Sequence, residues 1–438
     1  MMNIHQKTIT KKNTGIIFTG MLFLSAAILF SFSFDQQNNA FAQQSNTVVQ
    51  SAGSSQTMTG TIGGSQTSNT PNLAQNQITQ PNTDGGIQTQ ALSGQQIASN
   101  TQTQSNSGLL PSINVQQSAT SGNTVTNTNT QTNADGAADF SIQGAIVDQR
   151  AGAEQSATAT VGNVLPPFNP AIQTATDQNT LENIIAGSEN SVQQAIGTSA
   201  TPAKQLAVSA QSLTNVATND PNNVQEVTNT NRGTNNVNGI NNGQDIPDYA
   251  LQTLQPNQEG IVTQTQSNIL TLLPAASNTQ SSTTSNLLQN QLTGNNNVNP
   301  AQTAANTQQI GVSQLLQNLV SGSTQTIGLS NTGTNQISGN ANNAPTQTIQ
   351  GFNQVIGTAA PNANTQSASG PLTFDNTQTI TGGNTALNNL AVNGFAGVTQ
   401  SHLAPGGQTI PVAQTINPGT SLSNQLSNPN NSAVNTIP

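Results

Sequence analysis

"VTNTNTQTN", residues 125–133, alternates threonine with valine, asparagine or glutamine and contains no charge. In an extended chain successive side chains point to opposite faces, so Thr126, Thr128 and Thr130 share one face. Val125 and the amide side chains share the other. Such a stretch has no continuous apolar face to bury and no charge to keep chains apart. It is therefore either a flexible polar spacer or a strand that needs a neighbouring strand.

The first residues predict export. Three lysines precede an apolar run at 15–34, which is followed by the small-residue site Ala40-Phe41-Ala42. This order is typical of a secretory signal peptide, with cleavage between Ala42 and Gln43. The competing interpretation is an uncleaved anchor, because the apolar run approaches the roughly 20 residues that span a bilayer. After cleavage we expect a secreted, extracellular or cell-surface protein without a membrane span.

The end of this segment, "AFAQQ" at 40–44, resembles the signal peptides of secreted Asn/Gln/Thr-rich surface proteins of ammonia-oxidising archaea. The rest of the chain shares their composition. The resemblance implies export and does not imply an activity or a specific family.

The composition is unusual for a globular protein. Charged residues make up 5% of the chain, against about 25% in a typical protein. Aromatic residues make up 3%, and there is no tryptophan and no cysteine. A conventional core would be hard to fill, and disulfides and thiol chemistry are excluded. We therefore expect a mostly disordered, low-complexity chain with a β tendency.

Charge and composition divide the chain into five segments. Nearly all charges of the mature chain lie between Asp135 and Glu259. The segments are a signal peptide at 1–42, a Gln/Asn/Thr/Ser-rich low-complexity segment at 43–134, a mixed and partly helical segment at 135–218, an Asn/Gly-rich linker at 219–259 and a neutral Thr/Gln/Asn-rich loose repeat region at 260–438.

A short α-helical segment is predicted near 180–217. Residues 180–197 place apolar side chains near one helical face, and 201–217 begin with Thr201 and Pro202 in positions typical of a helix start. The expected apolar stripes consist of Leu181, Ile184, Ile185, Val192 and Ile196, and of Ala203, Leu206, Ala207, Ala210, Leu213 and Ala217.

The C-terminal region contains a loose repeat. "TQTI" occurs at 324–327, 346–349 and 377–380, and "QTI" returns at 408–410 and 414–416. The spacing lies within the range of stacked solenoid coils, so one interpretation is an irregular β-solenoid. The other is that Thr/Gln-rich sequence produces such words by chance.

Residues that could carry chemistry are few. The candidates are one histidine of the mature chain, an incomplete calcium-loop pattern and two nearby carboxylates. These are His402; Asn133, Asp135, Gly136 and Asp139; and Asp245 with Asp248. None makes a complete site, so we expect no catalytic, cofactor-binding or metal-binding residues and no enzyme. Without a basic patch, nucleic acid is not an expected partner.

The sequence favours a secreted structural or adhesive protein of the cell envelope or extracellular matrix, which resembles curli-type or adhesin material in composition. We expect self-association through β-pairing and amide ladders, with cell-surface polysaccharide or envelope proteins as further partners. The alternatives are a β-solenoid that binds polysaccharide or ice and an O-glycosylated disordered stalk. The one N-x-[ST] acceptor is Asn430, so N-glycosylation should be nearly absent.

Overall fold

The computed structural model describes 24 β-strands together with residues 197–198, 200–203, 255–256 and 300. The chain divides into a unit at Met1–Gln37 and a unit at Asn38–Pro438, and all described residues belong to the second. Residues 1–40, which carry most of the expected signal peptide, lie outside the described residues.

Fifteen strands form one sheet, here called sheet A. Its strands are β1 (Phe41–Gly60), β3 (Ile87–Gly108), β5 (Phe140–Val161), β7 (Ser191–Ile196), β8 (Lys204–Thr214), β10 (Ala250–Leu254), β11 (Asn257–Ser267), β13 (Ala301–Ala304), β14 (Thr307–Gln317), β16 (Thr346–Gln350), β17 (Asn353–Ile356), β18 (Asn364–Ala368), β20 (Thr399–Leu403), β21 (Gln408–Thr409) and β22 (Val412–Ile416).

Nine strands form the second sheet, sheet B. Its strands are β2 (Gly64–Ile78), β4 (Val115–Thr132), β6 (Ala171–Ser188), β9 (Asn222–Asn238), β12 (Ser277–Thr293), β15 (Ser323–Asn340), β19 (Asp375–Asn393), β23 (Ser421–Leu426) and β24 (Asn430–Thr436).

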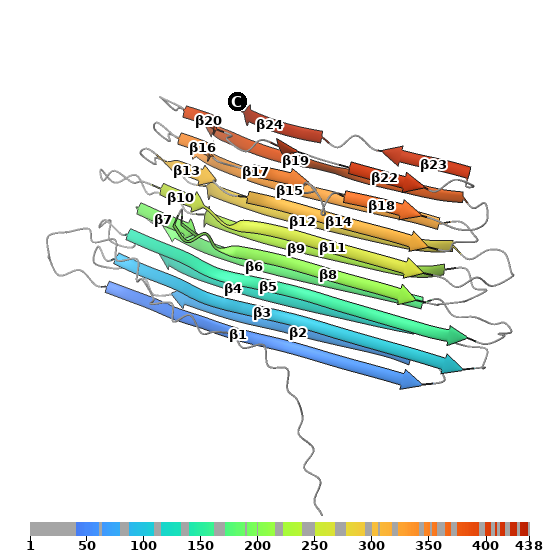
Figure 1. Ribbon diagram of the computed structural model, residues 1–438. Coiled ribbons are helices and arrows are strands. Elements are labelled where there is room, and N and C mark those ends of the chain that lie inside the picture. Colours follow the sequence, from blue (N-terminus) through green and yellow to red (C-terminus); the bar gives the residue numbers. More distant parts are fainter. Residues whose placement is uncertain are drawn as a thin grey trace, which may run out of the picture. The chain divides into compact units, whose positions relative to one another are not determined.

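The chain alternates between the two sheets, and each visit adds one parallel rung (Figure 1). One rung of sheet A and the following rung of sheet B make a coil. Coils 1 to 3 are β1–β2, β3–β4 and β5–β6; coils 4 to 6 are β7–β9, β10–β12 and β13–β15; coils 7 and 8 are β16–β19 and β20–β24. Equivalent residues of neighbouring coils pair in parallel register, as Thr120 pairs with Thr176 and Thr176 with Thr228. Successive coils therefore repeat the same inward and outward positions.

The expectation of a mostly disordered chain with a short α-helix was wrong. Among the described residues there is no helix, and strands fill nearly all of them. The low-complexity stretch after residue 42 contributes β1 to β4, and the stretch expected to be a linker contributes β9 and β10. The repetition is not confined to the C-terminal region, because the same two-sheet coil runs from β1 onward.

The helix prediction failed for a definable reason. Residues four apart share a face in a helix, but they also share a face in a strand, because four is a multiple of two. Leu181 and Ile185 are both buried in β6, whereas Ile184 points the other way and is partly exposed. In β8, Ala207 is buried and Leu206 is not. The two expected apolar stripes are therefore each divided between the two faces of a strand.

The opening stretch shows how the core is built. Val125 and Asn127 of β4 are fully buried between the sheets, whereas Thr126 and Thr128 on the alternate positions are partly exposed. The inward positions thus hold small or branched apolar side chains next to amides. Burial of the apolar ones contributes roughly 25 cal/mol per Å². The amides must find hydrogen-bond partners inside.

Sheet A is interrupted at the same place in several coils. The strands end and begin again between β7 and β8, between β10 and β11 and between β13 and β14. The excursion in coil 4 turns at Gly197, whose φ of 69° is a left-handed conformation that favours glycine. A Cβ there would also lie 2.7 Å from the backbone nitrogen of Ala203. In coil 2, Gly94 of the uninterrupted β3 has a φ of 131° and lies one residue further along the register.

No helix long and apolar enough to cross a membrane occurs in the described part of the chain.

Candidate functional site

Six columns of amide side chains run through the stack, and they are buried except at Gln44, Gln50 and Gln56 of coil 1, which are partly exposed. Four contain glutamine and two contain asparagine. The glutamine columns are Gln44–Gln90–Gln143–Gln194–Gln252–Gln302–Gln347, Gln50–Gln96–Gln149–Gln205–Gln258–Gln308, Gln56–Gln102–Gln155–Gln211–Gln264–Gln314 and Gln66–Gln117–Gln173–Gln225–Gln280–Gln325. The asparagine columns are Asn72–Asn123–Asn179–Asn231–Asn286–Asn331–Asn384 and Asn76–Asn127–Asn183–Asn235–Asn290–Asn335.

Each glutamine column is a chain of side-chain hydrogen bonds. Gln149 donates from Nε2 to Oε1 of Gln96 at 2.9 Å, and Gln205 donates to Gln149 at 3.0 Å. The partners lie 45 to 58 residues apart in sequence, which is one coil. These distances are those of normal hydrogen bonds. Because the amides stack at the strand spacing, one unbroken column links all coils in which it is described.

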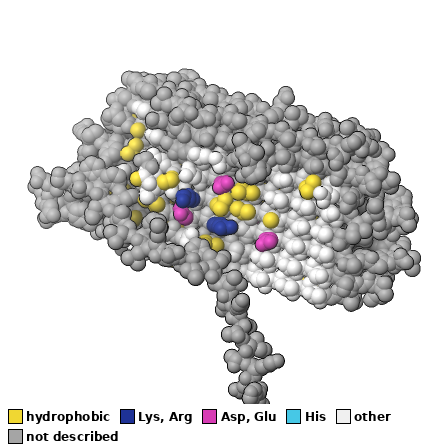
Figure 2. Space-filling view, viewed as in Figure 1, with side chains coloured by type: hydrophobic (Ala, Val, Ile, Leu, Met, Phe, Trp, Pro, Cys, Tyr) yellow, Lys and Arg dark blue, Asp and Glu magenta, His cyan; other side chains and the backbone are white. Residues whose placement is uncertain are grey.

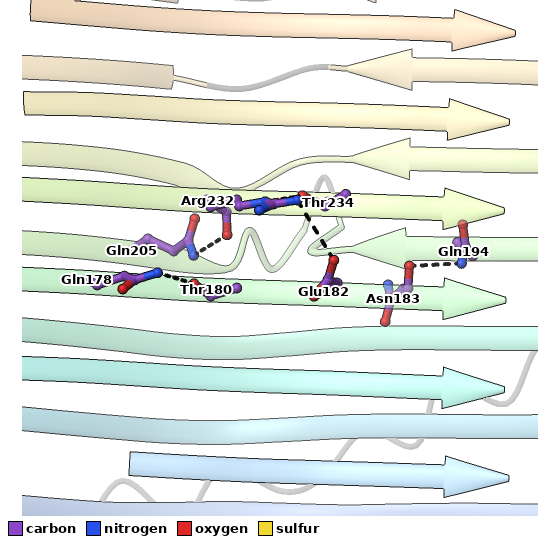
Figure 3. Close-up of polar contacts among 8 residues, drawn as sticks. All are labelled: Gln178, Thr180, Glu182, Asn183, Gln194, Gln205, Arg232 and Thr234. Carbon is purple, nitrogen blue, oxygen red and sulfur yellow. Dashed lines mark hydrogen bonds and ion pairs between the residues drawn. The ribbon is translucent and has the colours of Figure 1, made fainter. Parts of the chain in front are cut away.

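The second hydrogen of each interior glutamine amide binds the opposite sheet. Gln205, on sheet A, also donates to the backbone carbonyl of Arg232 on sheet B at 2.8 Å (Figure 3). Gln194 donates to the carbonyl of Asn183 in the same way at 3.1 Å. The amides therefore satisfy their donors inside the core, since one N–H points along the stack and one points across it.

The two asparagine columns run in the opposite sense. Asn179 donates from Nδ2 to Oδ1 of Asn231 in the following coil at 2.9 Å, whereas glutamines donate to the preceding coil. Its other N–H reaches the carbonyl of Leu206 on sheet A at 2.9 Å. The stack thus has a direction: glutamine N–H groups point toward coil 1 and asparagine N–H groups point toward coil 8.

One ionisable group lies in this core. Asp177 of β6 is fully buried between Ser121 and Asn229 of the neighbouring rungs. Ser209 Oγ lies within hydrogen-bond distance of both Asp177 Oδ2 and Asn229 Oδ1, although a hydroxyl has only one hydrogen to donate. The Asn229 amide is oriented by two carbonyls, which its Nδ2 reaches at 3.3 and 3.1 Å. Both contacts are satisfied when Asp177 is protonated, because the carboxyl then donates to Ser209 while Ser209 donates to Asn229.

Burial supports the same protonation state. Loss of hydration raises the pKa of Asp177 from 3.8 to about 7, and the hydrogen bonds that the ionised carboxylate would accept from Ser209 and Ser121 only partly oppose this. The carboxyl is therefore neutral over the acidic range in which exposed carboxyls are charged.

The other charged side chains that the structure describes lie on the outer faces. Figure 2 shows one face on which a few acidic and basic side chains surround apolar side chains within a mainly neutral surface. On sheet A, Arg150 and Glu259 stand in register on either side of Leu206. On sheet B, Arg232 forms an ion pair with Glu182 at 3.9 Å and donates to Thr234 at 3.0 Å (Figure 3). Such exposed pairs contribute little stability.

The edge formed by β1 and β2 is different. Neither strand contains a charged residue, and in the described part of the chain nothing pairs with their outer edges. The two large hydrophobic side chains that are exposed in the described strands, Val49 at 80% and Leu73 at 54%, both belong to this coil. Natural sheets usually protect an open edge with charge, and this edge has none.

The residues selected from the sequence lie in scattered places. Ala42 and Gln43 of the expected cleavage site are in β1, where they pair with Gln88 and Thr89. Asn430 begins β24. His402 lies in β20 opposite Ile349, and its side chain is outside the described residues, as are all of Asn133, Asp135, Gly136, Asp139, Asp245 and Asp248. No cluster of three or more potential metal ligands occurs in the residues that the structure describes.

Sequence reasoning missed the amide columns, although a signal was present. Glutamines recur six residues apart as Gln44–Gln50–Gln56, Gln90–Gln96–Gln102 and Gln143–Gln149–Gln155. The "TQTI" words were noticed, and they are parts of these columns. Gln325 and Gln378 pair in sheet B, whereas Gln347 lies in sheet A. The structural repeat is a coil of about fifty residues, and the "TQTI" motifs lie in both sheets of the coil.

Comparison of the chain with protein-family models, with curated proteins and with solved structures gave no match. The structural class of the protein is therefore defined by its fold alone, which is a parallel two-sheet β-stack with buried amide columns.

Proposed function

We propose that this chain is a secreted, non-enzymatic structural protein of the cell envelope or extracellular matrix that associates with itself by extending its own sheets. The observation that carries the proposal is the neutral, unpaired edge of β1 and β2 at the end of a regular parallel stack. An edge with free backbone groups and no protecting charge is a template for another strand. The signal-peptide pattern supports export.

The experiment is electron microscopy and fibre diffraction of the purified full chain, with size measured by gel filtration before and after incubation. We expect filaments whose diffraction shows the strand spacing of about 4.7 Å along the filament axis. A chain that stays monomeric at high concentration would contradict self-association. Culture fractionation tests secretion separately, and protein found only inside the cells would contradict export.

The threonines on the outer face of sheet B favour a second candidate function, which is binding to a polysaccharide surface. Thr120, Thr176, Thr228 and Thr283 stand in register on four consecutive rungs, and all are at least partly exposed. A β-solenoid that binds polysaccharide was one alternative from the sequence, and the register aligns these threonines. A flat array of hydroxyl and methyl groups at the strand spacing suits a regular sugar surface.

Cosedimentation with insoluble polysaccharides tests this candidate. Changing Thr176 and Thr228 to lysine should abolish binding, because two charged side chains interrupt the array. Changing Thr263 and Thr265 of β11 to lysine adds the same charge to the outer face of sheet A and should leave binding intact. Equal loss in both variants would point to a general charge effect and against a sheet B site. The disordered stalk considered from the sequence conflicts with the ordered strands.

A further inference from the structure

We propose that copies of this chain stack head to tail in one direction only, with coil 8 of one copy on coil 1 of the next, and that the amide columns determine this direction. The inference rests on the proposed function, because it specifies the surface and the polarity of the self-association. Its partner is a second copy of the chain. The argument has three parts: the amides at the first coil, the register at the last coil and the position of the charges.

The first coil presents unused glutamine N–H groups. Gln44, Gln50 and Gln56 each donate one hydrogen bond across the core, to the carbonyls of Gln77, Leu73 and Thr67 at 2.9, 2.8 and 2.8 Å. Their oxygens already accept from the glutamines of coil 2. An amide nitrogen carries two hydrogens, and in interior coils the second one donates to the preceding coil. Within the described residues of coil 1 that second hydrogen has no acceptor.

One asparagine column presents the complementary group at the same edge, whereas in the other Asn76 Oδ1 already accepts from Asn46 of β1. Asn72 donates both hydrogens, one to Asn123 at 2.9 Å and one to the carbonyl of Ile97 at 2.7 Å. Its Oδ1 has no donor among the described residues, whereas Oδ1 of Asn179 in an interior coil accepts from Asn123. Coil 1 therefore offers N–H donors in the glutamine columns and an oxygen acceptor in an asparagine column.

The backbone register carries all six columns to the last coil. The positions of coil 8 that continue the columns are all amide residues: Gln400, Gln408, Gln414, Asn424, Asn431 and Asn435. Coil 1 has amide residues at the same six positions, so a copy placed below coil 1 in register would continue every column. One position, Asn424 against Gln66, changes amide length.

The hydrogen-bond direction favours the head-to-tail arrangement over one in which two first coils meet. Two first coils placed together would bring glutamine donors against glutamine donors, and burying donors without acceptors is unfavourable. Placing a last coil against a first coil brings the opposite groups together, because every described step repeats the same sense of donation. The strands also continue in parallel only in this arrangement.

Charge placement agrees with stacking at both ends. The charged residues of the described strands lie on β5, β6, β8, β9 and β11 in the middle coils, apart from Asp375 at the start of β19. The strands of coils 1, 2, 6 and 8 contain no aspartate, glutamate, lysine or arginine. Stacking would also cover part of Val49 and Leu73, which lie on the outward-facing positions of the edge strands β1 and β2.

Chain termination tests the direction. A full-length variant with Gln50→Lys and Gln56→Lys places two ammonium groups in the columns at the edge of β1, while its last coil is unchanged. It should add to the first coil of a wild-type seed and then block further growth. Burying unpaired charges costs several kcal/mol, so growth on the variant should fall more than about tenfold. Small amounts should therefore slow elongation of wild-type seeds.

The matched control is Ser51→Lys with Ser55→Lys, which adds the same charge on the exposed face of the same strand. This control should elongate like wild type. A second pair on β2, Asn72→Lys against Leu73→Lys, tests sheet B independently if the β1 variant does not fold by circular dichroism. Absence of any wild-type filament would contradict the proposed function. Wild-type filaments into which the column variants incorporate as freely as their controls would contradict the direction and leave self-association standing.

Discussion

Asp177 shows how a single side chain responds to this core. It is the one described acidic side chain that is fully buried between the sheets. The residues in register with it in the adjacent coils are Ser121 and Asn229. Its environment offers neutral partners and no cation, so the neutral carboxylic acid is the stable form. The same exclusion of water from the amide columns makes burial of an ionised carboxylate unfavourable, because its hydration is lost.

We therefore predict that stability falls as the pH rises through the range from about 4 to about 7. The folded-state pKa of about 7 is above the unfolded value of 3.8, so in this interval the folded chain holds one more proton. The contribution is fully present below the unfolded pKa and is lost at the folded pKa, and its size is on the order of 4 kcal/mol. Urea unfolding followed by circular dichroism at several pH values measures it.

Asp177→Asn should remove this pH dependence, because an amide donates to Ser209 at any pH. Glu182→Gln is the control, since it neutralises a carboxylate on the outer face of the same strand. If wild type and Asp177→Asn lose stability in parallel between pH 4 and 7, the buried carboxyl is not the cause.

At the scale of one element, each strand is held by the amide it contributes to a column as well as by its backbone. Gln205 of β8 donates to Gln149 and to the carbonyl of Arg232, and it accepts from Gln258 at 2.8 Å. Gln205→Met keeps the volume but leaves the Gln258 N–H and the Gln149 oxygen without their partner. We expect a loss of about 3 kcal/mol or more, since each buried unsatisfied group costs about 1–3 kcal/mol.

Ser212→Met is the matched control, on the outer face of the same strand, and should change stability by less than about 0.5 kcal/mol. Equal losses in the two variants, measured by denaturant unfolding, would mean that the column contributes nothing specific.

The sequence indicated that the chain tends to form strands, but it did not indicate which segments are strands. Alternation in "VTNTNTQTN" indicated a strand that needs a neighbour, and the structure gives it two, β2 and β6. The apolar residues near 180–217 could not show whether the segment is a helix or a strand, because the spacing of Leu181 and Ile185 fits both the helical and the strand period. What decides it is pairing across about fifty residues, as when Gln205 meets Gln149. Long-range pairing of this kind leaves no local pattern in the strand itself.

The candidate site was predictable in kind but not in position. Amide ladders were expected from composition, yet the six-residue spacing of glutamines gives their place only when successive coils are aligned. The buried Asp177 gives no sequence signal, since nothing local distinguishes it from a solvated carboxylate.

At the scale of the whole molecule, neutral ends should make assembly insensitive to salt. Salt acts by screening charges, and the strands of coil 1 carry none. Elongation of wild-type seeds should therefore change little between low salt and 1 M salt. Growth that stops at high salt would indicate that charged contacts join the copies.

The C-terminal region should also assemble largely independently of pH. A fragment of 260–438 should assemble over roughly pH 4–9, because only Asp375 and His402 titrate in it. Light scattering follows both.

The central claim is that consecutive coils stack in parallel register, and a cysteine-free chain allows a direct measurement. Thr176→Cys with Thr228→Cys places two thiols at paired positions of β6 and β9, at a strand separation within the range for a disulfide. Thr176→Cys with Thr234→Cys shifts the second thiol six residues along β9, roughly 20 Å away. Mild oxidation of dilute protein followed by non-reducing electrophoresis and peptide mass analysis should show an intramolecular disulfide in the first pair and none in the second. Equal crosslinking of both pairs, or of neither, would contradict the stacked register.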